Sequence, residues 1–211
     1  MVERSSTTNR TVVRLTPTLH HPGEPQMSAR VLAFVGSLRA ASHNRQLAET
    51  AVKLSPEGLD IDLYEGIADV PFYNEDIDNP ENLPAAVAKL REAAASAEAF
   101  LLFTPEYNGT MPAVLKNVID WLSRPYGAGS MTGKPVVVVG TAFGQYGGVW
   151  AHDEARKAAG IAGGAVLEDL KLAIPGSVTR FADTHPADDA EVVTLVTDLL
   201  DKLSAQLKTS A

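Results

Sequence analysis

The chain of 211 residues has the length of one domain with some residues to spare, and 45% of its residues are hydrophobic, enough for one sizeable core. Its formal net charge of −8 at pH 7 argues against nucleic acid or an anionic membrane as the main partner, because both would repel an acidic protein. The absence of cysteine excludes disulfides, thiolate nucleophiles and cysteine-ligated metals. No apolar run reaches the length of a membrane span.

The first part of the chain differs from the rest. Residues 1–29 are rich in Ser, Thr, Arg and Pro and show no apolar period, which predicts a disordered tail ahead of a folded domain at 30–211. Met27 stands just before the first strand signal, so the native start could lie there. Because this segment lacks the apolar stretch of a secretory signal, we expect a cytoplasmic protein.

From Val31 on, short apolar runs alternate with stretches of helical spacing. The apolar runs at 31–35, 59–63, 99–103, 135–140 and 165–172 predict five strands. Helical spacing predicts helices at 44–54, 83–94, 112–122, 149–159 and 192–203, and a long loop is expected at 66–80. This alternation predicts an α/β fold with a doubly wound, five-stranded parallel sheet, for which the flavodoxin-like strand order is 2-1-3-4-5.

In that order the first, third and fourth strands are neighbours, and their carboxyl ends open onto one crevice. The loops there are 36–44, 104–110 and 140–148, which we call the first, second and third loops. Ligands of open α/β sheets bind in such a crevice. These loops are also the most chemically distinctive parts of the chain.

The first loop suits a phosphate group, because it joins a buried strand to a helix whose first N–H groups and dipole favour an anion. Ser37, Ser42 and Asn44 can add donors, and Arg39 and Arg45 can supply positive charge. Alternatively, Ser42 or Asn44 only caps the helix and the arginines are solvated. The loop has neither a Walker pattern, nor Gly-x-Gly-x-x-Gly, nor the cysteine of a low-molecular-weight phosphatase.

The second loop suits a flat heterocycle. Pro105, Tyr107 and Gly109 allow close backbone approach, and Asn108 can donate and accept hydrogen bonds. The alternative is an ordinary strand-to-helix turn with Pro112 at the first helical position. In the third loop, the glycines at 144, 147 and 148 permit positive φ and close approach, although a flexible surface loop would look similar. Together, one loop for a phosphate and two for a ring describe an FMN site.

These motifs resemble the NADPH-dependent FMN reductase family, which includes quinone, azo-dye and chromate reductases. The resemblance rests on Gly36-Ser-Leu-Arg39 with Ser42, Asn44 and Arg45, on Thr104-Pro-Glu-Tyr-Asn108, and on the stretch 115–122. It implies that Ser37, Arg39, Ser42, Asn44 and Arg45 hold the phosphate, and that Pro105, Glu106, Tyr107, Asn108 and Gly109 line the isoalloxazine. The third loop resembles the family more loosely and adds Thr141, Gly144 and Gly147 to the expected cofactor contacts.

The resemblance implies a flavoenzyme in which FMN passes two electrons from NADPH or NADH to a quinone, free flavin or similar acceptor in a ping-pong cycle. No side chain is nominated as a catalytic acid or base, and no metal is expected. Glu106 is tempting, but it could instead pair with an arginine in a subunit contact. Two rival functions stay open: a flavodoxin-type electron carrier without its own substrate, and a non-catalytic nucleotide sensor.

The helix at 112–122 also carries a prediction about assembly. Leu115, Val118, Ile119 and Leu122 share one face, which should cover the sheet, while Trp121 lies on an adjoining flank. An exposed tryptophan there would be an interface anchor. Alternatively, the neighbouring helix or the 124–132 loop buries it within the chain. Resemblance to the family favours an exposed Trp121 and a homodimer or homotetramer with this helix at the contact.

Overall fold

The computed structural model describes residues 28–210, so the predictions for the tail and for a start at Met27 fall almost entirely outside the described residues. The strands are β1 (Ala29–Val35), β2 (Leu59–Leu63), β3 (Ala99–Phe103), β4 (Pro135–Thr141) and β5 (Ala165–Ile174). The α-helices are α1 (His43–Lys53), α2 (Ala85–Ser96), α3 (Ala113–Leu122), α4 (Val149–Ile161), α5 (Ser177–Arg180) and α6 (Ala190–Ser210). Strand β1 begins at Ala29, one residue before the predicted boundary at 30.

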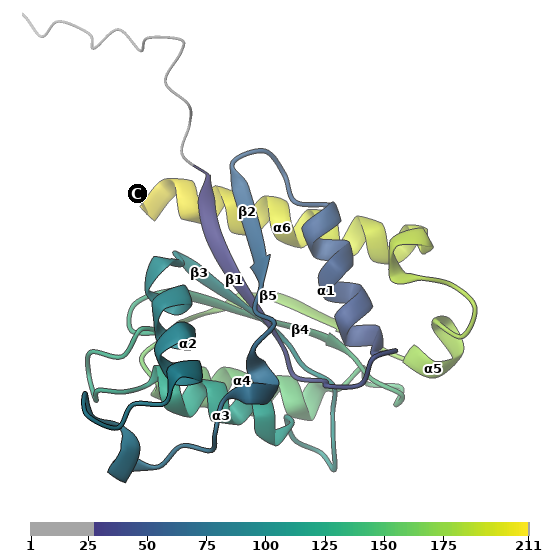
Figure 1. Ribbon diagram of the computed structural model, residues 1–211. Helices are drawn as coiled ribbons and strands as arrows, with labels where there is room; N and C mark the ends of the chain where they lie inside the picture. Colours follow the sequence, from purple (N-terminus) through teal and green to yellow (C-terminus); the bar gives the residue numbers. More distant parts are fainter. Residues whose placement is uncertain (1–27, 211) are drawn as a thin grey trace, which may run out of the picture.

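The five strands form one parallel sheet in the order β2-β1-β3-β4-β5, which confirms the predicted flavodoxin-like fold. All five residues of the central strand β3 are buried, as expected where helices cover both faces of a parallel sheet. Within β3, Leu101 packs with α1 and α6 on one face, whereas Phe100 and Leu102 pack with α2, α3 and α4 on the other. These two helical layers are visible in Figure 1.

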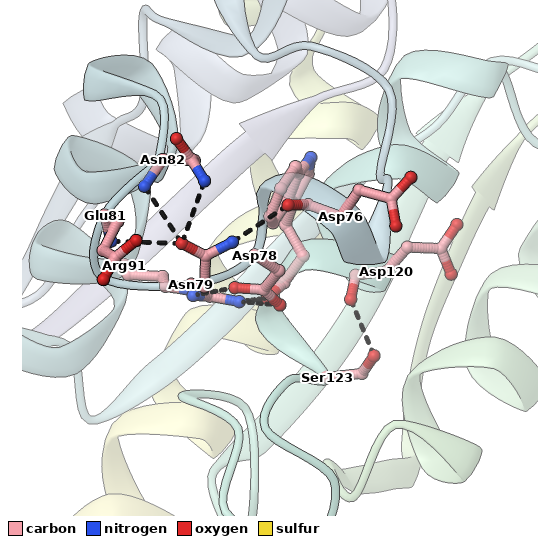
Figure 2. A network of polar contacts seen from close by, with 9 residues as sticks. Asp76, Asp78, Asn79, Glu81, Asn82, Arg91, Asp120 and Ser123 are labelled. Atoms are coloured by element: carbon pink, nitrogen blue, oxygen red, sulfur yellow. Dashed lines mark hydrogen bonds and ion pairs between the residues drawn. The ribbon is translucent and has the colours of Figure 1, made fainter.

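The connection from β2 to α2 contains two short 3₁₀ turns, η1 (Ile67–Asp69) and η2 (Glu75–Ile77), where one long loop was expected. It is fastened to α2 by a forked ion pair, in which the Arg91 guanidinium donates to both carboxylate oxygens of Asp78 at 2.6 and 2.8 Å. Figure 2 shows this pair beside the Asn79 side chain, whose amide oxygen accepts from Asn82. The connection therefore lies against the helices as a fixed cover.

That cover buries Trp121, so the prediction of an exposed interface anchor was wrong. The Trp121 side chain is 0% exposed. Its indole Nε1 donates to the Pro71 carbonyl oxygen at 2.7 Å, and the Tyr73 ring meets it edge-on with centroids 4.9 Å apart. Asn117 holds the same segment by accepting from the Tyr73 N–H at 2.8 Å. A buried tryptophan needs a partner for its N–H, and this backbone provides one. The two elements that the sequence suggested also contribute, because Arg91 of α2 lies over the Trp121 ring at 5.5 Å and Met131 belongs to the same buried cluster.

Between residues 28 and 210, no helix combines the length and the apolar character that crossing a membrane requires.

Candidate functional site

The carboxyl ends of β1, β3 and β4 bring the three loops together. The Gly36 N–H donates to the Phe103 carbonyl at 2.8 Å, and the Thr104 N–H donates to the Val139 carbonyl at 2.9 Å. The first and second loops thus each start from a backbone hydrogen bond to the neighbouring strand. The juxtaposition expected from the strand order is therefore present.

The first loop presents a cradle of backbone donors. Ser42 is the N-cap of α1, and its hydroxyl oxygen accepts from the Arg45 N–H at 3.3 Å, so the capping alternative is correct for this residue. Its hydroxyl hydrogen remains available to donate. Within residues 28–210, no acceptor faces the N–H groups of residues 37–41, 43 and 44. Such a cluster of N–H groups at a helix start suits an anion with several oxygens.

The two arginines of the first loop are placed differently. The Arg45 guanidinium donates to both carboxylate oxygens of Glu65 at 2.6 and 2.5 Å, and its Nε donates to Glu49 at 2.8 Å. The hydrogen bonds that Arg45 donates to Glu65 and Glu49 raise its pKa further above its usual range. Arg39 is exposed and has no ion pair with any carboxylate in the described chain. Both arginines line a cavity of about 410 Å³ that Ser37 also lines.

Asn44 and Thr141 contact each other rather than point outward. The Asn44 side chain is buried, donates from Nδ2 to the Thr141 carbonyl at 2.8 Å, and accepts from the Thr141 N–H at 2.9 Å. The Thr141 hydroxyl in turn donates to the Ile174 carbonyl at 2.8 Å. This pair joins the start of α1 to the end of β4. In the structure, the two residues set the spacing between the first and third loops.

The second loop is a tight hairpin turn. Asn108 and Gly109 have φ values of 53° and 78°, and the Tyr107 N–H donates to the Thr110 carbonyl at 2.9 Å. Two successive residues with positive φ favour Asn-Gly, as in a type I′ turn. Pro105 is buried behind the turn, whereas Tyr107 is about half exposed at 49%. The turn therefore offers one aromatic ring and free backbone groups to the crevice.

Glu106 has an intrachain role. Its Oε2 accepts from the Ala151 N–H at 3.3 Å, in the first turn of α4. A carboxylate at a helix N-terminus is favourable because it satisfies an unpaired N–H and faces the positive end of the dipole. The contact fixes the second loop to α4.

The glycines of the third loop divide into two kinds. Gly147 and Gly148 have φ values of 64° and 88°, and a Cβ on Gly147 would lie 2.8 Å from the backbone carbon of Ala173. Both positions therefore require glycine. Gly144 has no positive φ, and a Cβ there would meet nothing within 4 Å. Gly144 therefore uses neither the positive φ nor the close approach that a glycine permits.

Sequence reasoning missed the buried floor beneath the loops. A Cβ on Gly140 would lie 2.2 Å from the Thr104 carbonyl oxygen, 2.7 Å from His152 Nε2 and 3.1 Å from Asn44 Oδ1. His152, on α4, is 1% exposed. Its position was detectable in principle, because the alanines at 151, 155 and 159 mark the buried face of this helix and His152 adjoins it.

The surroundings of His152 keep its ring neutral. Burial, aided by the positive charge of Arg156, lowers its pKa to about 4. The Thr104 carbonyl and Asp153 act in the opposite direction and favour the protonated ring. The buried Nε2 nevertheless has no hydrogen-bond partner of normal geometry within residues 28–210. A neutral, enclosed imidazole fits a structural element of the floor better than a group that exchanges protons with a substrate.

Comparisons with known proteins agree on one family. Residues 29–179 match the family model described as NADPH-dependent FMN reductase. A quinone reductase of Pseudomonas putida is 36% identical over 159 residues, which cover 75% of this chain and 84% of the relative. An NAD(P)H-dependent FMN reductase of Pseudomonas aeruginosa is 41% identical over 164 residues, covering 78% and 76% of the two chains. Among solved structures, FerB, a flavoenzyme NAD(P)H:(acceptor) oxidoreductase from Paracoccus denitrificans, superposes with a TM-score of 0.77 at 30% identity, covering 86% of this chain and 98% of FerB.

Proposed function

The chain belongs to the NADPH-dependent FMN reductase family, and from this we propose that it uses FMN to pass electrons from NAD(P)H to a quinone, a free flavin or a similar small acceptor. It is an oxidoreductase of this family. The observation that carries the proposal is the meeting of three donor-rich loops at the carboxyl ends of β1, β3 and β4. This is where open α/β sheets bind nucleotides.

The residues present fit FMN. The unpaired N–H groups of the first loop, with the hydroxyls of Ser37 and Ser42 and the charge of Arg39, match a phosphate dianion. The second and third loops match a flat ring, because Tyr107 presents an aromatic face and the N–H groups of residues 106, 108 and 109 have no acceptor in the described chain. We assign Asn44 and Thr141 to holding these loops in register. Arg45 contributes less than Arg39 to neutralising the charge of the phosphate.

When bound, FMN supplies the redox chemistry, taking two electrons from the nicotinamide and giving them to the acceptor. The protein's own part is to bind and orient. His152 is enclosed with a pKa of about 4, and Glu106 is occupied by a helix N–H, so neither is placed to move a substrate proton. We propose that the nicotinamide and the acceptor occupy the same place in turn, which is a ping-pong cycle.

Absorbance spectroscopy of the pure protein tests this function. We expect a flavin spectrum, or its appearance after FMN is added, bleaching by NADPH or NADH, and recovery of the colour on addition of a quinone. Steady-state rates should give parallel double-reciprocal lines, whereas intersecting lines would indicate a ternary complex. Bleaching without turnover of free quinone or flavin would favour the electron carrier. A protein that cannot be loaded with FMN would leave the nucleotide sensor.

We also propose a homo-oligomer, a dimer or tetramer, through a surface that excludes the buried Trp121. A groove of about 640 Å³ runs between α3 and α4. Each wall carries both charges: Lys116 pairs with Asp120 on α3 at 2.6 Å, and Lys157 pairs with Glu154 on α4 at 3.9 Å. A two-fold interface must be complementary to itself, and walls of mixed charge around an apolar floor meet that condition.

The oligomer can be tested on an exposed side chain of this groove. Ile161, which lines it, is 78% exposed. Light scattering should show an oligomer for the wild type and a smaller species for Ile161→Glu, because the new charge would be buried without a partner. The control is Val178→Glu, an exposed position outside the groove. A monomeric wild type would contradict the proposal.

We also propose a cytoplasmic location, which cell fractionation can check.

A further inference from the structure

Exposed aromatic side chains are concentrated at the loops of the proposed site. Eleven large hydrophobic residues are exposed within 28–210, and five of them lie in or directly beside the three loops. These are Leu38, Tyr107, Phe143, Tyr146 and Trp150. Single exposed hydrophobic residues need no explanation, but a cluster of this kind on a monomer usually marks a binding surface.

Trp150 and Tyr146 form the core of this cluster, and more than half of each residue is exposed. Trp150 lies in the first turn of α4 and is 59% exposed, and Tyr146 in the third loop is 63% exposed. Their ring centroids are 6.5 Å apart, with planes inclined at 44°. Two aromatic side chains thus lie side by side, each with more than half of its surface available for contact with another ring.

The pair is anchored to the part of the site assigned to the flavin ring. A Cβ on Gly109, in the second loop, would lie 3.9 Å from Cε3 of Trp150. The neighbouring Ala151 N–H is bonded to Glu106 of the same loop. The indole therefore borders the second loop directly, while Tyr146 belongs to the third. A molecule that stacks on this pair would lie beside both loops.

The charges around the pair indicate what kind of molecule stacks there. The segments 104–112 and 141–150 contain no lysine or arginine, in contrast to the arginines of the first loop. The nearby carboxylates are Glu106, which accepts from the Ala151 N–H, and the exposed Asp153, which pairs with Arg156 on α4. A phosphate group would find no lysine or arginine in either loop segment to pair with, whereas an uncharged flat ring would bury apolar area against both side chains.

We propose that Trp150 and Tyr146 form an aromatic wall that stacks on the ring of an uncharged, flat quinone and thereby selects such acceptors over non-planar or strongly anionic ones. The proposal rests on the proposed function and names its acceptor class. Both side chains determine specificity by binding, and neither takes part in electron or proton transfer.

Two acceptors of opposite shape test the wall in the FMN-loaded protein. We expect Trp150→Ala to lower kcat/KM for menadione about tenfold, as for the loss of a stacked aromatic contact with its buried area. With ferricyanide, an octahedral trianion that cannot stack, kcat/KM should stay within about twofold. Trp150→Phe should recover most of the menadione activity, because it restores an aromatic face. Phe72→Ala removes an exposed aromatic side chain on the β2–α2 connection and serves as the control.

Equal losses with both acceptors, or no loss with menadione, would overturn the wall. A loss confined to the rate at which NADPH bleaches the flavin would assign the pair to the nicotinamide instead and would also overturn it. A protein that binds FMN but is not reduced by NAD(P)H would count against the proposed function alone. The two failures are therefore distinguishable.

Fluorescence provides a readout that does not depend on turnover. The chain has two tryptophans, and Trp121 is fully buried, so the Trp121→Phe variant reports on Trp150 alone. In the absence of NAD(P)H, menadione should quench this emission to a saturating level and protect it from acrylamide. Quenching that rises linearly without saturation would show collisions only and would refute binding at the wall.

Discussion

Replacing His152 with glutamine should remove a large part of the acid sensitivity of the fold. In the folded protein, burial and then Arg156 lower the pKa of His152 from 6.5 to about 4. Because the folded-state pKa lies below the unfolded value, the unfolded chain takes up a proton first as the pH falls. Stability is therefore lost between pH 6.5 and about 4, and is fully present above that window.

The size of the effect follows from the shift. At about 1.4 kcal/mol per pKa unit, a shift from 6.5 to about 4 corresponds to about 3 kcal/mol of unfolding free energy. Thr104 and Asp153 act against the shift, and their influence is already contained in that pKa. A loss of this size is a sizeable fraction of the stability of an ordinary domain. Glutamine keeps a polar side chain of similar length in the buried floor but does not titrate.

Urea unfolding at a series of pH values from 7 to 4.5 measures the effect. The wild type should lose about 2–3 kcal/mol more than His152→Gln over this range. His43→Gln is the matched control, because the pKa of His43 is also lowered by burial but its ring is only half-buried. Parallel curves for the wild type and His152→Gln would show that the imidazole is protonated freely in the folded state, and the reasoning would fail.

Five further substitutions test other parts of the structure. Trp121→Ala should lower the unfolding free energy by about 3–5 kcal/mol in urea titrations, because it empties a fully buried site; a loss below about 1 kcal/mol would mean that the indole is not enclosed. Gly140→Ala should abolish FMN binding or folding for lack of space, whereas Gly144→Ala should leave melting temperature and FMN content unchanged. In fluorescence titrations, Arg39→Ala should weaken FMN binding about tenfold, and more so at low salt. Arg45→Ala should weaken FMN binding clearly less, because two carboxylates already neutralise the Arg45 guanidinium. Equal losses would show that Arg45 leaves its ion pairs for the phosphate.

The sheet was predictable because its strands are short apolar runs between turn-forming residues. The central run at 99–103 coincides with β3, whose burial on both faces leaves no alternation to interpret. Predicted ends were less accurate: β5 runs on to Ile174, and α6 spans 190–210 rather than 192–203. The four-residue helix α5 and the 3₁₀ turns were missed, since elements this short depend on caps and tertiary contacts rather than on an apolar period.

The candidate site was predictable as three loops, but not as a set of contacts. Helical spacing located Trp121 on a flank of α3, yet nothing local to that helix shows that Pro71 and Tyr73, about fifty positions earlier, cover it. The sequence likewise indicated Arg45 as a source of positive charge for the phosphate. Its ion-pair partner Glu65, however, comes from the end of a different strand. Side-chain partners distant in sequence carry no periodic signal, so a single sequence leaves them undetermined.

An acidic chain that binds a phosphate dianion has to supply the donors locally, and here few of them are charges. Arg45 is largely neutralised, and Arg39 is left as the exposed arginine of the first loop without a carboxylate partner in the described chain. Most of the cradle therefore consists of backbone N–H groups and hydroxyls, which act only if the loop keeps its shape. That shape depends on the Asn44–Thr141 pair and on the close approach at Gly140. Changes in this buried floor should thus reduce flavin affinity as strongly as changes in residues that touch the phosphate.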